Sequence, residues 1–162
     1  MDRSYLERNR VSRERLHLVV TSLHGDQFQR GVHDGWTVVA VLAHLAAEEG
    51  RIQGWLEDWE RQGIHDSLAL REWERWAIRM FGENDNEQRL PQWLVADPAS
   101  AASETIAAAD RIDAKIEALA PNLVDALQST TPFWGSRRQW ALDRSIHRHE
   151  HLDTIERVLQ GR

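Results

Sequence analysis

Apolar residues recur at spacings of three and four along most of the chain, and alternation of β-branched residues is almost absent. This periodicity is typical of amphipathic helices. It predicts four long helices, at about residues 3–23, 37–62, 102–119 and 136–159. Thr37 stands where the second helix needs an N-cap residue, and Ser136 does the same for the fourth. The pattern therefore predicts an all-α protein.

The region between the second and third long helices follows a less regular pattern. We expect one short helix at residues 68–80 and another at residues 86–95, the latter interrupted by Pro91. The Asp97-Pro98 step marks a boundary, because proline disfavours the helical conformation in the residue before it. This middle region is the part of the chain whose structure the sequence defines least well.

Together these elements describe a helical bundle, with short extra helices between the second and third long ones. After the third long helix, Pro121 begins a short turn at residues 122–127. The chain has 162 residues, no internal repeat and no long linker, so we expect a single domain over residues 1–162.

The composition excludes several classes of function. The chain contains no cysteine, which rules out disulfides, thiolate zinc sites, iron–sulfur clusters and a cysteine nucleophile. A transition metal would need imidazole and carboxylate ligands. A net charge of −6 and scattered basic residues argue against binding to nucleic acid. Because no apolar run is long enough to cross a membrane and no secretory signal is found, we expect a cytoplasmic protein.

Histidine is abundant, with eight in the chain, and two of them have a spacing that suits a metal. His147 and His151 are four residues apart on a predicted helix, so both rings project from one face, as in helices that chelate a metal. Solvated pairs with this spacing are also common. His149 should point to another side of the helix. The other histidines outside the second helix are expected to be solvated or singly hydrogen-bonded: His17, His24, His33 and His65.

His44 lies in the most apolar helix of the chain, where an imidazole without a partner costs a few kcal/mol. One interpretation is a hydrogen bond to a carboxylate or a carbonyl. The other joins His44 to His147 and His151 around one ion, since packed helices bring such groups within reach. Three neutral imidazoles would leave a coordination position open, as in catalytic rather than structural metal sites.

Two segments resemble the DinB superfamily of helical-bundle proteins. Residues 35–45 (GWTVVAVLAHL) are similar to the family's tryptophan, capped helix start and LxHL ligand segment. Residues 145–155 (SIHRHEHLDTI) are similar to its terminal HxxxHxxxI segment. The resemblance implies an up-down-down-up four-helix bundle, with Ni²⁺, Zn²⁺ or a similar ion on His44, His147 and His151. It assigns no ligand role to His149.

The resemblance also suggests a range of activities. DinB-like proteins include thiol-dependent transferases and isomerases, hydrolase-like detoxification proteins and members without known activity. A three-histidine metal site would activate water, or an external small-molecule thiol, against a small electrophilic substrate. Many relatives are homodimers, and two-fold pairing is the simplest closed assembly. The alternative is a non-catalytic bundle that holds a structural metal or a metal-free histidine cluster. The substrate, the native metal and the thiol stay open.

A few other residues are candidates for roles around the metal. Glu48, one helical turn beyond His44, would act as a base or would accept a hydrogen bond from a metal-binding histidine, and Asp143 could do the same for His147. For both, an ordinary solvated carboxylate is the alternative. Arg137 or Arg138 would hold an anionic group of the substrate, although arginine is also common at the start of surface helices. The eight tryptophans, among them Trp134 beside these arginines, are expected mainly to pack, and they also suit pocket walls and subunit interfaces.

Overall fold

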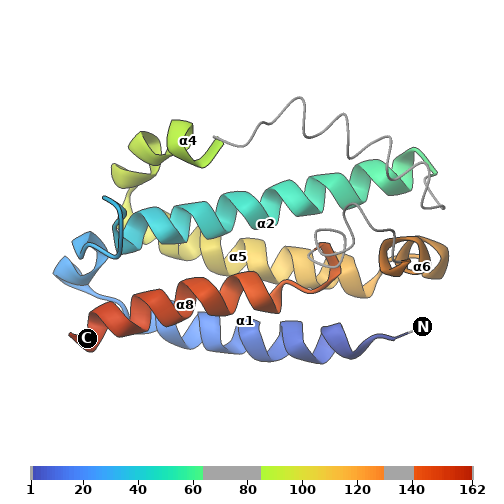
Figure 1. Cartoon of the computed structure of the whole chain (residues 1–162), viewed down its shortest axis with the longest axis horizontal. Helices are drawn as coiled ribbons and strands as arrows, with labels where there is room; N and C mark the ends of the chain where they lie inside the picture. Colours follow the sequence, from blue (N-terminus) through green and yellow to red (C-terminus); the bar gives the residue numbers. More distant parts are fainter. Residues whose placement is uncertain (1, 64–84, 130–140, 162) are drawn as a thin grey trace.

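The computed structural model describes residues 2–63, 85–129 and 141–161 (Figure 1). Within these ranges the protein is all-α, and the only strand-like pairing is an isolated bridge between Gly31 and Thr37. No helix in the described part of the chain combines the length and apolar character needed to cross a membrane. The helices are α1 (Ser4–Ser22), the 3₁₀ helix η1 (Gly25–Gln29), α2 (Val38–Arg61), α4 (Asp85–Leu94), α5 (Pro98–Glu117), α6 (Pro121–Gln128) and α8 (Ser145–Leu159).

The four long helices lie alongside one another as a bundle. α1 and α8 run in one direction, and α2 and α5 run in the other (Figure 1). α5 packs against α1 and α2, and α8 packs against the same two helices. α2 and α8 are antiparallel neighbours, and α8 lies alongside the first half of α2.

Most helix starts agree with the sequence signals. α2 begins directly after Thr37, whose hydroxyl accepts a hydrogen bond from the Ala40 backbone N–H, as predicted. α5 begins four residues before the predicted start, because Pro98 occupies its first position and the Asp97 carboxylate accepts a bond from the Ser100 N–H. The segment after Pro121, predicted as a turn, is the helix α6.

Pro91 does not interrupt its helix. α4 runs from Asp85 to Leu94 with the proline inside it. A proline within a helix frees the carbonyl four residues earlier, here that of Glu87. Glu87 is exposed, so water can satisfy that carbonyl and the helix continues. The helix predicted at residues 68–80 lies outside the described residues.

The prediction of one continuous final helix up to residue 159 is wrong. Ala141 and Leu142 are helical, the next two residues are not, and α8 starts at Ser145. Asn9 of α1 causes the break: its Nδ2 donates to the Leu142 carbonyl (2.7 Å) and its Oδ1 accepts from the Arg144 N–H (2.8 Å). These two bonds replace bonds that a continuous helix would make internally. The predicted N-cap Ser136 lies outside the described residues.

The core consists of two apolar clusters with a polar layer between them. One cluster is built around Leu56, Ile112 and Leu123, and the other around Leu42, Ala109 and Leu152. The polar layer contains buried side chains from all four long helices and from the residue before α8, as follows: Asn9, Ser12, Glu49, Asp113, Arg144, Ser145 and Arg148. The histidine cluster described next lies beside this layer, where α2 faces α8.

Candidate metal centre

Three histidines meet between α2 and α8. The Nε2 atom of His147 lies 3.3 Å from Nε2 of His44 and 3.2 Å from Nε2 of His151. One ring nitrogen from each of the three residues lies within 4.8 Å of those of the other two. The structure thus brings together the three residues that the sequence singled out.

The antiparallel packing of α2 against α8 explains this meeting. His44 is 4% exposed and lies between Leu42 and Leu45, which are fully buried in the core. His147 and His151 are half-buried, and their spacing of four residues stacks both rings on the side of α8 that faces α2. One turn of α2, with His44, and one turn of α8, with His147 and His151, therefore bring three imidazoles together.

Two tryptophans cover the His44 ring. The rings of Trp36 and Trp93 lie edge-on to it, with centroid distances of 5.4 Å and 5.2 Å, and 5.6 Å separates the two indoles. A tight turn directs Trp36 inward, with positive φ at Asp34 (41°) and Gly35 (82°). The Nδ1 atom of His44 is buried without a hydrogen-bond partner among the described residues. Its environment is therefore more apolar than that of the other two histidines.

All three imidazoles are neutral at physiological pH. Burial lowers the pKa of His44 to about 3, and the positive charges of Arg51 and Arg144 add to this effect. Burial and Arg144 lower the pKa of His147 to about 2, and burial lowers that of His151 to about 4. Neutral imidazole is the form of histidine that binds metals.

The donor set fits a divalent transition ion. Zinc binds histidine nitrogen at about 2.0–2.1 Å, so nitrogens arranged tetrahedrally around it are about 3.3 Å apart. Two of the three separations, 3.3 Å and 3.2 Å, match that spacing, and the third lies within 4.8 Å. Three imidazoles suit zinc, nickel, copper or iron, whereas calcium and magnesium prefer oxygen ligands.

Three of the remaining described histidines, His17, His24 and His149, have partners outside this cluster, whereas His33 lies beside it and contributes, after burial, to the lowered pKa of His151. His149 accepts a hydrogen bond from Arg15 (2.9 Å) on the side of α8 that faces α1, as the sequence predicted. His17 contacts Asp110, and His24 contacts the carbonyl of Ser22. His33 packs against Trp36. His65 lies outside the described residues.

The other predicted site residues have different surroundings. Glu48 lies one turn beyond His44, is half-buried and pairs with Arg51 (3.2 Å). Burial raises the pKa of its carboxyl group. Asp143 pairs with Arg8 (2.8 Å) and accepts a bond from the backbone N–H of Ser145 at the start of α8. Trp134, Arg137 and Arg138 lie outside the described residues.

The sequence analysis missed a buried group of charges next to the cluster. Glu49 accepts one bond from Arg144 and one from Arg148, both of 2.8 Å, and Arg148 also donates to Asp113 (2.7 Å). The signal was present in the helical spacing: Glu49 shares a stripe with Leu45 and Ile52, and Arg148 shares one with Leu152 and Ile155. A charge on an apolar stripe needs a buried partner.

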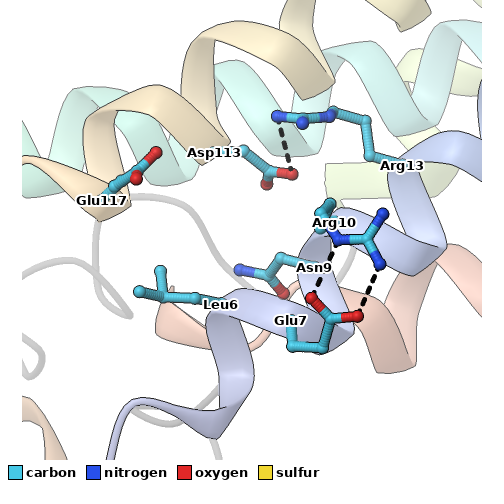
Figure 2. A pocket seen from close by; sticks show the side chains of 7 residues that line it. All are labelled: Leu6, Glu7, Asn9, Arg10, Arg13, Asp113 and Glu117. Atoms are coloured by element: carbon cyan, nitrogen blue, oxygen red, sulfur yellow. Dashed lines mark hydrogen bonds and ion pairs between the residues drawn. The ribbon is translucent and has the colours of Figure 1, made fainter.

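A shallow pocket of about 200 Å³ lies on the other side of this charged group, between α1 and α5 (Figure 2). Figure 2 shows Arg13 reaching Asp113 and Arg10 reaching Glu7 along its wall, with separations of 3.4 Å and 2.8 Å. Both arginines are thus already paired with carboxylates. We assign this pocket no ligand.

No protein-family model, curated protein or solved structure matches this chain. The assignment of the candidate metal site therefore rests on the geometry of the three histidines and on the motifs in the sequence.

Proposed function

We propose that this protein is a metal-dependent enzyme of the DinB type, which holds one zinc or nickel ion on His44, His147 and His151. The observation that carries the proposal is the convergence of three neutral imidazoles at separations that suit one ion. The directions of the four long helices, as well as the two motif segments, support the DinB assignment. We further propose that the enzyme is a hydrolase or a thiol transferase that acts on a small electrophile.

The chemistry follows from the donor set and its surroundings. His44, His147 and His151 would hold the ion, and the ion would supply the chemistry that lowers the pKa of water or of a thiol and polarises a substrate oxygen. The chain has no cysteine, so a thiol would come from a small-molecule cofactor. Glu48 is our candidate for the base, because its raised pKa suits a carboxyl group that takes up and returns a proton.

Metal analysis of the purified, untagged protein tests the ligand assignment. We expect one equivalent of zinc or nickel in the wild type and in His149→Ala. His44→Ala, His147→Ala and His151→Ala should each lose stoichiometric metal, because two imidazoles hold an ion far more weakly than three. The pair His147→Ala and His149→Ala is the sharpest comparison, since both residues lie on α8. Equal metal content in these two variants would contradict the assignment.

A structural metal is the second candidate, because Trp36 and Trp93 cover His44 and the cluster ties α2 to α8. The two candidates differ in whether an external ligand can reach the ion. We expect the absorption spectrum of the Co²⁺-loaded protein to change when a small thiol or azide is added. An unchanged spectrum would favour the structural metal. The homodimer expected from the sequence stays a prediction, which light scattering would test.

A further inference from the structure

Arg144 connects the buried charges to the histidine cluster. Its side chain is 3% exposed, its Nε donates to Oε2 of Glu49 (2.8 Å), and one of its terminal nitrogens lies 3.3 Å from Nδ1 of His147. Arg144 therefore contacts both Glu49 and the histidine cluster.

The position of Arg144 is fixed from two other helices. Oδ1 of Asn9 in α1 accepts a hydrogen bond from the Arg144 backbone N–H, and Glu49 of α2 orients the guanidinium. The second oxygen of Glu49 is held by Arg148, which in turn is held by Asp113 of α5. Because each carboxylate has defined partners, the guanidinium has little freedom to turn away from His147.

This contact restricts where the proton of His147 can be. A guanidinium has five N–H donors and no acceptor, so the Nδ1 atom that it contacts has to accept. A neutral imidazole carries one proton, which then lies on Nε2. That Nε2–H points at the Nε2 atoms of His44 and His151, 3.3 Å and 3.2 Å away, and either of them can accept it.

We propose that Arg144, oriented by Glu49, is a positioning residue that holds His147 in the tautomer with its proton on Nε2. The consequence for metal binding rests on the proposed function. A metal ion needs the Nε2 lone pair, and the proton on that atom competes with it. Arg144 should therefore weaken the binding of the metal and make the metal exchangeable. This effect is opposite to that of a carboxylate or carbonyl, which usually accepts the N–H of a histidine ligand and strengthens its bond to the metal.

The first test reads the tautomer directly and needs no metal. Nitrogen-15 NMR of the histidine side chains is recorded on the full-length, chelator-treated protein, and the His147 signals are assigned with His147→Gln. We expect a bare Nδ1 and a protonated Nε2 for His147. A protonated Nδ1 would overturn the proposal, because the guanidinium could not then donate to it. This result stands even if the wild type binds no Co²⁺ and the proposed function fails.

The second test measures Co²⁺ affinity by titration against a competing chelator. Arg144→Met removes the donor to Nδ1 and should bind Co²⁺ about tenfold more tightly than the wild type, given the usual strength of a charge-assisted hydrogen bond. Arg15→Met is the matched control, since Arg15 makes the same kind of contact to Nδ1 of His149 (2.9 Å), a histidine of α8 that lies outside the cluster. Its Co²⁺ affinity should stay within about threefold of the wild type.

Circular dichroism checks that each variant is folded. If Arg144→Met is not, Arg144→Gln replaces it, because its amide can accept a proton from Nδ1 and should also tighten binding. If neither variant folds, the NMR result on the wild type decides. Unchanged or weaker Co²⁺ binding in a folded Arg144 variant, or equal tightening in Arg15→Met, would overturn the proposal.

Discussion

The charge state of the three clustered histidines depends on their burial, and this makes the stability of the protein sensitive to pH. In the unfolded chain an imidazole takes up a proton near pH 6.5. In the folded protein the pKa values are about 3 for His44, about 2 for His147 and about 4 for His151. Between these limits the unfolded state binds more protons than the folded state, so stability rises with pH. The stability that the three neutral imidazoles contribute is fully present above pH 6.5 and is lost as the pH falls below 6.5.

We expect chelator-treated protein to lose roughly 1.4 kcal/mol of unfolding free energy per histidine for each pH unit between 6.5 and 5. Urea denaturation at a series of pH values measures this slope. Replacing any one of the three histidines with glutamine should reduce the slope by about a third. An unchanged slope in all three variants would mean that these rings are not held neutral by burial.

The three clustered histidines were easier to predict than their neighbours. The spacing of His147 and His151, together with the apolar setting of His44, is local information that the sequence contains. Trp93 and Arg144 reach the cluster only through tertiary packing, and no local pattern connects either residue to His44 or His147. Glu49 is intermediate, since its place on an apolar stripe was visible but its partners, about 95 and 99 residues away along the chain, were not.

At the level of the helices, the sequence predicted elements whose ends are set by nearby residues. α2 was located to within one residue because Thr37 caps it. The start of α8 was missed because Asn9, 135 residues earlier, ends the preceding helical segment. A break imposed from another helix leaves no proline or glycine to mark it. This break matters for the site, because it places Arg144 beside Glu49 and His147.

Replacing Asn9 should therefore destabilise the protein more than its small size suggests. Asn9→Ala removes the hydrogen bonds that the side chain donates to the buried Leu142 carbonyl and accepts from the buried Arg144 N–H. Each unsatisfied group costs about 1–3 kcal/mol, so we expect a loss of about 2–5 kcal/mol in urea denaturation. Asn122→Ala is the control, since Asn122 is exposed and, among the described residues, its side chain bonds only its neighbour Leu123. Equal losses in the two variants would show that Asn9 does not hold the break.

The bundle as a whole has its polar layer between two apolar clusters. Each long helix contributes to this layer, so the buried charges fix how the helices are aligned along their length. A shift of α8 along α2 would separate Arg144 and Arg148 from Glu49 and would pull His147 away from His44. Buried ion pairs are a poor source of net stability, but they favour one alignment over others. We infer that the charged layer sets the alignment that the histidine cluster requires.

The same arrangement would couple the proposed metal binding to the folding of the whole molecule. The candidate ligands come from two helices, with His44 and His147 separated by 103 residues, so the unfolded chain cannot present them together. A ligand that binds only the folded state at 100 times its dissociation constant stabilises it by about 2.7 kcal/mol. For a chain of this size that corresponds to a rise of roughly 5–10 °C in Tm.

We expect this rise when the wild type is titrated with Zn²⁺ or Ni²⁺ in a thermal melt. His44→Ala should abolish it, although α8 keeps both of its histidines, and His17→Ala should show the full rise because His17 lies on α1 against Asp110. An equal rise in His44→Ala would mean that α8 binds the ion alone, and that the metal does not link the two helices.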